Sequence, residues 1–278
     1  MPPHSPITEQ ALAFIGGGNM ASAIVGGLRR QGMPGHLIEV VEPSAGSRER
    51  LRAQFDVQVT AQADASLERA SVVVWAVKPQ VFAQAAQQAG AHTRGALHLS
   101  VAAGIGTDSI ARWLGSELIV RAMPNTPALI GRGITGLFAR PAVEARHKAT
   151  IEAIVATTGQ WVWLEQEERL DAVTALSGSG PAYVFYFLEA MVEAGTQMGL
   201  SPEQARQLAL ATFTGASALA ADSPEPLALL RERVTSKGGT THAALSAMQA
   251  ADVKAHFMAA MQAARQRAQE LGQEFGRQ

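Results

Sequence analysis

The 278-residue sequence predicts an α/β fold in two parts, a doubly wound parallel sheet followed by an all-helical region. Two patterns carry this prediction. Up to about residue 164, short apolar runs alternate with helix-like stretches rich in Ala and Gln, which is typical of a sheet covered on both faces. From about residue 165 the strand signal disappears. We therefore expect one domain over residues 1–164 and a second over 165–278.

The predicted strands of the first part are short runs of apolar, often β-branched residues. They are continuous instead of alternating, as expected for strands buried on both faces. Helical patterns such as 20–30 and 80–89 lie between them, and this repeated order predicts right-handed parallel connections. The predicted strands are residues 12–15, 37–41, 57–59, 72–76, 97–101, 118–122, 134–138 and 161–164.

The second part is rich in Ala, Leu, Met, Gln and Glu and predicts helices only. Ser201 before Pro202, and Ser223 before Pro224, each fit a cap followed by the first helical residue. The long apolar faces favour either tight packing within the chain or a helical dimer interface. The predicted helices are residues 167–176, 181–198, 202–221, 225–234, 242–250 and 253–274.

Composition argues against several functions. The chain carries 23 Lys and Arg against 24 Asp and Glu, a balance that argues against a broad electrostatic grip on nucleic acid. It has no Cys, which excludes disulfides, thiolate nucleophiles and Cys-bound metal centres. Its seven His form no short-range ligand motif, so we expect no metal.

The N-terminus has no basic region, and its apolar stretch is short and ends in Gly, so we expect no signal sequence. The sequence also has no run of about 18 apolar residues of the kind that crosses a membrane. We expect a cytoplasmic protein that binds neither membrane nor nucleic acid.

A glycine-rich turn follows the first predicted strand. Its residues match the G-x-G-x-x-A form of the dinucleotide fingerprint. Gly16 permits the tight turn, Gly18 lets a pyrophosphate approach the backbone, and Ala21 lets the helix pack close to the strand. The helix start offers N–H groups and a positive dipole end. We expect a dinucleotide to bind here, in preference to a purely structural turn, at Gly16, Gly17, Gly18, Asn19, Met20 and Ala21.

The second predicted strand leads into Glu42, where an acid favours NAD because it accepts hydrogen bonds from the adenine ribose and repels a 2′-phosphate. Ser44, Ser47, Arg48 and Arg50 follow at once and are candidates to cradle a 2′-phosphate. Glu42 as a solvated strand end is a third possibility. The sequence leaves the choice between NADH and NADPH open.

Three further segments follow predicted strands, and ligands bind at the carboxyl ends of parallel strands. Val77, Lys78 and Pro79 follow the fourth strand, with Pro79 placed to begin a helix. Small residues around Ala102 would let a cofactor lie against the backbone. Asn125 follows the sixth strand, and its amide suits either a nicotinamide carboxamide or the local backbone.

Two glycine-rich segments interrupt the helical part. In residues 177–180, Ser179 is placed to cap the next helix, but the segment also offers N–H and hydroxyl groups to a small anion. Residues 235–241 open a further helix, and N–H groups at such a start suit a carboxylate. Caps alone are a poor explanation for two such segments in one regular helical region.

The chain resembles the Δ1-pyrroline-5-carboxylate reductases, the last enzymes of proline biosynthesis. The resemblance rests on residues 14–21, 77–80, 100–104, 121–128, 177–183 and 235–241, in this order and at these separations. It implies a Rossmann domain, a helical dimerisation domain, homodimers that assemble into rings, and reduction of a cyclic imine acid to L-proline by NADPH or NADH.

The resemblance also implies residue roles. Thr241 would lie closest to the ring nitrogen or the carboxylate and act in catalysis, orienting the substrate and handling a proton. Glu167 would touch the substrate across the dimer. Lys237 departs from the family, in which Pro is commoner. The other implied cofactor contacts are Ala76, Val77, Lys78, Pro79, Val101, Ala102 and Ala103, and the other substrate contacts are Ser177, Gly178, Ser179, Gly180, Ser236, Gly238, Gly239 and Thr240.

Three alternatives remain open. Another Rossmann-fold imine or hydroxyacid reductase would share the architecture, but a hydroxyacid dehydrogenase needs a catalytic Lys, and the helical part has only Lys237 and Lys254. A non-catalytic dinucleotide-binding regulator would explain the first part, but it would have no need of a second anion site. A purely structural helical oligomer would leave the glycine fingerprint unexplained.

Overall fold

The computed structural model describes residues 6–276. Residues 1–5, which belong to the segment where we expect no signal sequence, and residues 277–278 lie outside the described part. Contacts within the chain divide it into two compact units, residues 1–179 with 264–278, and residues 180–263. The functional boundary expected between 164 and 165 stays a prediction, because the compactness of one chain does not decide where a dimerisation domain begins.

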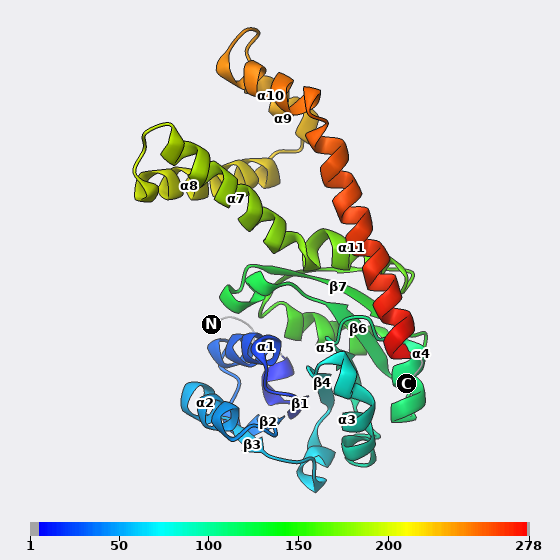
Figure 1. The fold of residues 1–278 in the computed structure, drawn as a ribbon. Helices are drawn as coiled ribbons and strands as arrows, with labels where there is room; N and C mark the ends of the chain where they lie inside the picture. Colours follow the sequence, from blue (N-terminus) through cyan, green and yellow to red (C-terminus); the bar gives the residue numbers. More distant parts are fainter. Residues whose placement is uncertain (1–5, 277–278) are drawn as a thin grey trace. The chain divides into compact units, whose positions relative to one another are not determined.

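The first unit is built on one eight-stranded sheet in the order β3-β2-β1-β4-β5-β6-β7-β8 (Figure 1). Every predicted strand is present, with ends shifted by a residue or two. The reversal of order beside β1 is the switch point at which doubly wound sheets bind ligands. The strands are β1 Leu12–Ile15, β2 Ile38–Val41, β3 Gln58–Thr60, β4 Val72–Trp75, β5 Leu97–Ser100, β6 Ile119–Met123, β7 Gly133–Ala139 and β8 Gly159–Trp163.

The sequence predicts a parallel sheet, but one pair of strands is antiparallel. β6 and β7 pair antiparallel, with Ala122 opposite Leu137, while β8 runs parallel to β7. The connection between β6 and β7 holds only the short 3-10 helix Thr126–Ile130. A parallel crossover needs about a dozen residues or more, so this connection is too short and the chain turns back instead.

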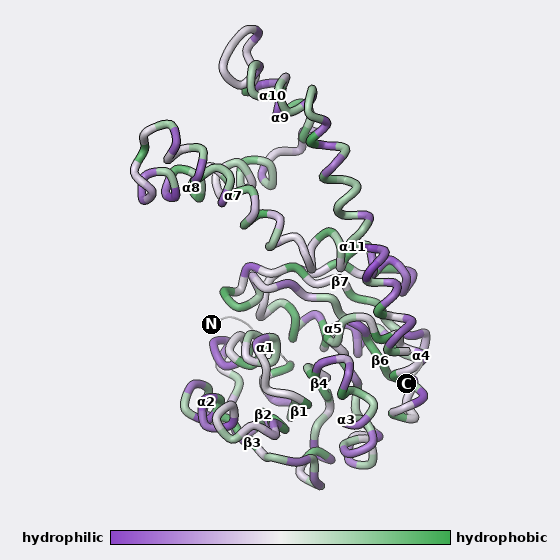
Figure 2. Tube along the Cα trace, in the orientation of Figure 1, coloured by the Kyte–Doolittle hydropathy of each residue, from purple (hydrophilic) through white to green (hydrophobic). Residues whose placement is uncertain are grey.

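Helices cover both faces of the sheet. Leu12 and Phe14 of β1 pack with α1, α2 and α5 on one face, while Ala13 and Ile15 pack with α3 and α4 on the other. This alternation follows from the period of two along a strand. Hydrophilic residues gather on α2, which keeps only Leu51 buried (Figure 2). The helices are α1 Asn19–Arg30, α2 Ala45–Phe55, α3 Phe82–Ala89, α4 Thr107–Leu114, α5 Ala145–Val155 and α6 Arg169–Val173.

The remaining helices begin at residue 180. They are α7 Gly180–Gln197, α8 Pro202–Asp222, α9 Leu227–Arg233, α10 Thr240–Ala250 and α11 Val253–Gly276, and the last turns of α11 belong to the first unit. Ser201 caps α8 as predicted, in a capping box with Gln204. The matching prediction for Ser223 and Pro224 is wrong, because Ser223 ends α8 and α9 begins only after Pro226.

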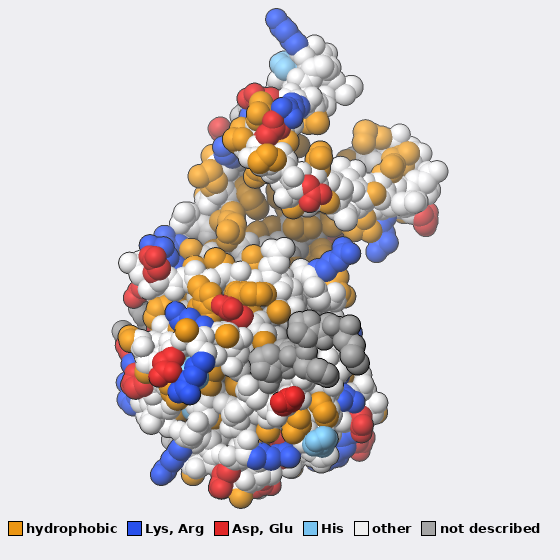
Figure 3. Space-filling view, turned by 180° about the vertical axis from the view of Figure 1, so that it is seen from behind, with side chains coloured by type: hydrophobic (Ala, Val, Ile, Leu, Met, Phe, Trp, Pro, Cys, Tyr) orange, Lys and Arg blue, Asp and Glu red, His pale blue; other side chains and the backbone are white. Residues whose placement is uncertain are grey.

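The helices of the second unit bury few of their own side chains. α7 and α8 pack through small residues, with Gly195 against Ala205. Large apolar side chains of both helices are exposed, among them Phe185, Tyr186 and Leu208. Figure 3 shows orange hydrophobic side chains over α7 and α8. In residues 6–276, no helix combines the length and apolar character that a membrane span requires.

Candidate functional site

The glycine turn after β1 has the backbone that its sequence predicts. Gly16 adopts φ +95°, and its N–H donates to the Val41 carbonyl at 2.8 Å. A Cβ at Gly16 would lie 2.7 Å from the Ala76 carbonyl oxygen, so β1 and β4 leave room only for glycine. This conformation is open to Gly at no steric cost, whereas other residues adopt it with strain.

Gly18 serves a different purpose. It caps α1 without any side-chain hydrogen bond to the first turn, and a Cβ built there would meet no atom within 4 Å. The space above Gly18 is therefore open, and the N–H groups that begin α1 have no side-chain cap. Such a start, with its positive dipole end, fits a pyrophosphate. Ala21, one turn on, is fully buried, as close packing of helix on strand requires.

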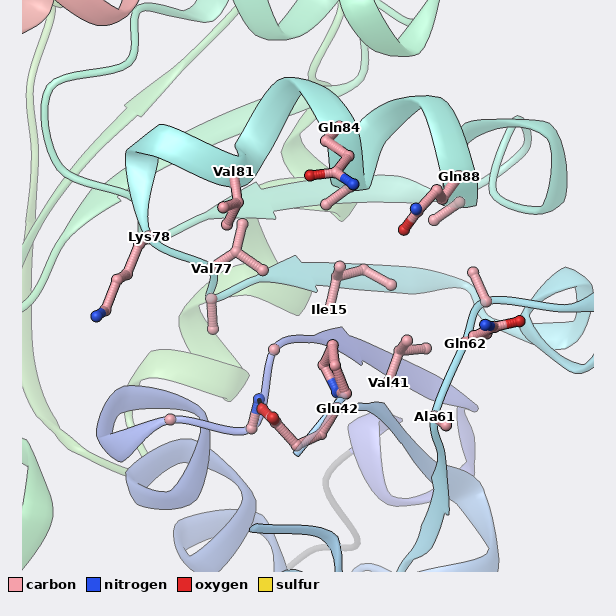
Figure 4. Close-up of a pocket in the computed structure, with 18 residues that line it drawn as sticks. Ile15, Val41, Glu42, Ala61, Gln62, Val77, Lys78, Val81, Gln84 and Gln88 are labelled. Carbon is pink, nitrogen blue, oxygen red and sulfur yellow. Dashed lines mark hydrogen bonds between the residues drawn. The ribbon is translucent and has the colours of Figure 1, made fainter. Parts of the chain in front are cut away.

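A pocket of about 550 Å³ opens beside this turn. Gly16–Gly18, Glu42, Ala76, Val77 and Lys78 line it, so the structure brings much of the predicted cofactor set together. Figure 4 shows Val81, Gln84 and Gln88 projecting toward the pocket from η4 (Pro79–Val81) and α3. Pro79 begins η4, as predicted.

The pocket also contains residues that sequence reasoning missed. Ala61, Gln62 and Ala63 line it directly after β3, as do Val81, Gln84 and Gln88. The rule that ligands bind at the carboxyl ends of parallel strands applies to β3 as well and would have indicated residues 61–63. No comparable signal in the sequence marks the α3 residues, because only the folded chain lays that helix along the pocket.

Glu42 is held in place by the backbone, so its interpretation as a solvated strand end is wrong. The Gly17 N–H donates to Oε2 at 2.9 Å, and the Ser44 N–H donates to Oε1 at 2.9 Å. Arg48 Nη1 donates to the carbonyl oxygens of Glu42 and Pro43, at 2.9 and 2.6 Å. The carboxylate thus belongs to a fixed rim of the pocket.

The other predicted cofactor residues lie outside the pocket lining. The Val101 N–H donates to the Trp75 carbonyl at 3.0 Å, which places 101–103 just past β5, the strand beside β4. Ala102 is buried and Ala103 exposed. Asn125 Oδ1 accepts a hydrogen bond from the Ile134 N–H at 3.0 Å, so its amide oxygen anchors the turn between β6 and β7. Cofactor contacts at these residues stay predictions.

The serine–glycine segment near residue 178 is a π-helical turn over Thr174–Gly178. The expected cap at Ser179 is wrong, because Ser179 has helical backbone angles and its N–H donates to the Thr174 carbonyl at 2.8 Å. A capping residue has extended angles instead. Gly178 packs against Met123, and a Cβ there would lie 2.5 Å from Met123 Cε, so that side chain would have to shift. Such π-turns are frequent at functional sites.

The second glycine segment opens α10. Gly238 has φ +74°, the Gly239 N–H donates to the Ser236 carbonyl at 3.0 Å, and a Cβ at Gly239 would lie 2.5 Å from Ser236 Oγ. Gly239 is the N-cap and supplies no side-chain acceptor, so the N–H groups of Thr240 and Thr241 are free of a side-chain cap. Thr241 is half-buried, whereas Lys237 and Thr240 are exposed.

The Glu167 carboxylate forms hydrogen bonds and an ion pair within its own unit. Its Oε1 accepts from the Thr107 N–H at 2.8 Å and from Arg121 Nη1 at 2.9 Å, and its Oε2 accepts from the Thr107 hydroxyl at 2.5 Å. The carboxylate thereby caps α4, whose N-cap Gly106 has no side chain. Nearby, burial raises the pKa of Asp171, an effect that Arg121 opposes.

The predicted site residues fall in both units. The cofactor residues, Glu167 and Ser177–Ser179 lie in the first unit, whereas Gly180 and residues 236–241 lie in the second. Among residues 6–276, no group of three or more His, Asp or Glu side chains is placed to hold a metal ion.

Comparison with known proteins gives two matching family models. Residues 167–271 match a model described as pyrroline-5-carboxylate reductase dimerisation. Residues 11–104 match a model described as NADP oxidoreductase, coenzyme F420-dependent. The first model covers most of the helical half, and the second covers β1 through β5.

Relatives align over most of the chain. A pyrroline-5-carboxylate reductase of Pseudomonas aeruginosa is 43% identical over 86% of this chain and 88% of its own length. One of Haemophilus influenzae is 41% identical, over 91% and 94%. The solved pyrroline-5-carboxylate reductase of Coxiella burnetii has a TM-score of 0.87 at 38% identity, covering 94% of this chain and 98% of that one. The Plasmodium falciparum enzyme, solved with NADP bound, has a TM-score of 0.85 at 27% identity, covering 95% and 99%.

Proposed function

This chain belongs to the pyrroline-5-carboxylate reductase family of oxidoreductases, and on that premise we propose that it reduces 1-pyrroline-5-carboxylate to L-proline, the last step of proline biosynthesis. NADPH or NADH supplies the hydride that reaches the imine carbon. The observation that carries the proposal is the occurrence of two helix starts without side-chain caps, at α1 and at α10, each preceded by a glycine with positive φ, Gly16 and Gly238.

The first of these, the turn before α1, holds the pyrophosphate of the cofactor. Gly18 leaves the approach open, and the N–H groups that follow it receive the phosphate oxygens. Val101, Ala102, Ala103 and Asn125 would flank the nicotinamide half, the last through its free amide NH₂ because its oxygen is used by Ile134.

The second helix start, at α10, holds the carboxylate of the imine acid. The N–H groups of Gly238, Thr240 and Thr241 carry no charge and yet suit a carboxylate, since the dipole of α10 adds to their donor strength. The Thr241 hydroxyl faces the ring nitrogen, orients it and hands on a proton through water. A neutral hydroxyl is too weak an acid to do more at neutral pH.

The remaining predicted contacts complete the substrate site. We propose further substrate contacts at Ser177–Gly180, which overlap the π-turn, and at Ser236 and Thr240. Glu167 would reach the substrate of a partner protomer, and its bonds to Thr107 and Arg121 would fix the direction in which it does so. Correct placement of hydride donor and acceptor, at about 3–3.5 Å, would supply most of the rate.

The assembly we propose is a homodimer through the helical region, with rings of dimers as the larger state. The match to a dimerisation model over residues 167–271 supports this, as do the exposed apolar side chains of α7 and α8. A soluble monomer rarely exposes large contiguous apolar patches. Sedimentation of the purified protein would reveal the assembly, and a species of about 29 kDa at micromolar concentration would contradict it. A cytoplasmic location stays a prediction.

The activity test follows oxidation of NADH and NADPH at the nicotinamide absorbance, with and without 1-pyrroline-5-carboxylate. We expect oxidation that depends on the imine. Folded protein that binds dinucleotide but gives no turnover would contradict the proposal and favour a regulator. Turnover on hydroxy acids instead would favour a hydroxyacid reductase.

Thr241→Ala is the sharpest variant for the proposed site. Loss of an orienting hydrogen bond should lower kcat at least about tenfold, with the cofactor KM little changed, because Thr241 lies outside the dinucleotide pocket. Thr241→Ser keeps the hydroxyl and should retain most of the activity. Wild-type turnover by the alanine variant would remove Thr241 from the mechanism.

A further inference from the structure

Glu42 stands at the place where NADH and NADPH differ. It follows β2 directly, at the carboxyl end of the strand next to the glycine turn, and its own N–H donates to the Thr60 carbonyl at 2.9 Å. In a doubly wound sheet, the adenine ribose lies at this position, and the two cofactors differ there by a 2′-phosphate. The groups around Glu42 therefore decide which cofactor fits.

The carboxylate of Glu42 is fixed by two backbone donors from two different loops. Gly17 N–H and Ser44 N–H each hold one of its oxygens at 2.9 Å. A Cβ at Gly17 would lie 3.2 Å from Oε2, so the turn packs directly on the carboxylate. Each carboxylate oxygen can still accept a further hydrogen bond, and a ribose hydroxyl is a suitable donor.

Among the described residues that line the pocket, no cationic side chain lies beside Glu42 to compensate the charge of a 2′-phosphate. Of the 18 described residues that line it, Glu42 is the only acid and Lys78 the only base. Figure 4 shows Lys78 directed away from Glu42, with Gln62 and Gln88 at the opposite end of the pocket. A phosphate monoester carries a charge of about −1.5 to −2 at pH 7, and it would face the fixed carboxylate.

Several side chains of the turn between β2 and α2 that could approach a phosphate also have partners within the turn. Ser44 Oγ accepts from the Ser47 N–H at 3.4 Å and caps α2. Arg48 Nη1 bonds the carbonyls of Glu42 and Pro43, and Arg50 reaches Ser47. A phosphate here would share Arg48 and Arg50 with these partners, and it would still lie beside the carboxylate of Glu42.

From these contacts we infer that Glu42 is the residue that sets cofactor choice and that it makes this reductase select NADH over NADPH. The inference rests on the proposed function for its reaction, though not for the pocket itself. It also separates this chain from the relative of Plasmodium falciparum, which was solved with NADP bound.

The test compares wild type with Glu42→Gln, which keeps the shape of the side chain and removes its charge. Binding of NADH and of NADPH is measured by nicotinamide fluorescence, and kcat/KM is measured for each with 1-pyrroline-5-carboxylate. We expect wild type to favour NADH at least about tenfold in both readouts, and the variant to lose at least about tenfold of that ratio. Glu49→Gln, which removes an exposed carboxylate from α2, should keep the wild-type ratio.

Two results would overturn the inference. One is a wild-type protein that binds NADPH as well as or better than NADH. The other is an equal loss of both cofactors in Glu42→Gln, which would reveal a merely structural role for the carboxylate. Arg48→Ala completes the set, because a selective loss of NADPH in that variant would assign the phosphate to Arg48. If binding favours NADH but no imine-dependent oxidation occurs, the proposed function fails and the inference about Glu42 stands.

Discussion

Gly16 and Gly18 are two residues apart, yet the fold needs them for different reasons. Gly16 has a left-handed backbone and no room for a Cβ beside Ala76, so it is required by the fold. Gly18 has an ordinary φ of −72° and open space around it, so the folded chain alone does not require glycine there. A ligand that approaches the backbone closely would account for it.

This difference predicts opposite outcomes for two alanine variants. Gly18→Ala should unfold at the wild-type urea concentration but raise the KM for NADH at least about tenfold, since its methyl group enters the pyrophosphate space. Gly16→Ala should lose about 1–3 kcal/mol of stability, because alanine is strained at that φ and meets Ala76. Normal cofactor affinity in folded Gly18→Ala would contradict the assignment of this turn.

The residues that sequence reasoning identified well are those whose backbone is special. The fingerprint indicated Gly16 through Ala21 because the residue type determines which φ angles are sterically allowed. The sequence could not predict the hydrogen-bond partners of Glu42 and Glu167. Gly17 lies 25 positions before Glu42, and Thr107 lies 60 before Glu167. Only the folded chain brings such residues together.

At the scale of elements, continuous apolar runs predicted all eight strands, and β1, β2, β4 and β5 are buried throughout, as such runs imply. The reversed direction of β7 was missed, since a run of apolar residues carries no direction. The π-turn at Thr174–Gly178 was missed as well. Its sequence looks like that of a regular helix, because a π-turn differs from one only by an extra residue within the turn.

Helix α4 provides the prediction at this scale. Because Glu167 caps α4 and pairs with the nearly buried Arg121, Glu167→Gln should lower the free energy of unfolding by about 2 kcal/mol. Glu117→Gln is a matched control on an exposed pair with Arg140, and it should cost less than about 1 kcal/mol. Urea unfolding of both variants measures this. A Glu167→Gln protein of full stability and reduced turnover would instead favour direct substrate contact alone.

At the scale of the whole molecule, His98 links stability to pH, because it is the one buried histidine among residues 6–276. Burial lowers the pKa of His98 to about 4 from an ordinary value of 6.5. Its Nδ1 accepts from Trp75 Nε1 at 3.1 Å, and its Nε2 is buried without a hydrogen-bond partner among the described residues. Neutral His98 is therefore built into the core, and protonation favours the unfolded chain.

The sign of the pH effect follows directly. Above pH 6.5 the imidazole is neutral in both states, and stability is lost as the pH falls from about 6.5 toward 4, by up to about 3 kcal/mol. His98→Gln keeps an acceptor for Trp75 but does not titrate, so its stability should fall less over this range. Unfolding followed by tryptophan fluorescence at pH 7 and pH 4.5 compares them. Parallel losses in the two proteins would contradict this role for His98.

We expect this molecule to transfer a hydride from a nicotinamide cofactor to an imine carbon. The most direct measurement incubates the protein with 1-pyrroline-5-carboxylate and NADH deuterated at both C4 positions, then locates the label in the product by mass spectrometry and NMR. We expect L-proline with one deuterium on the ring carbon that was doubly bonded to nitrogen. Unlabelled proline, or oxidised cofactor without proline, would contradict it.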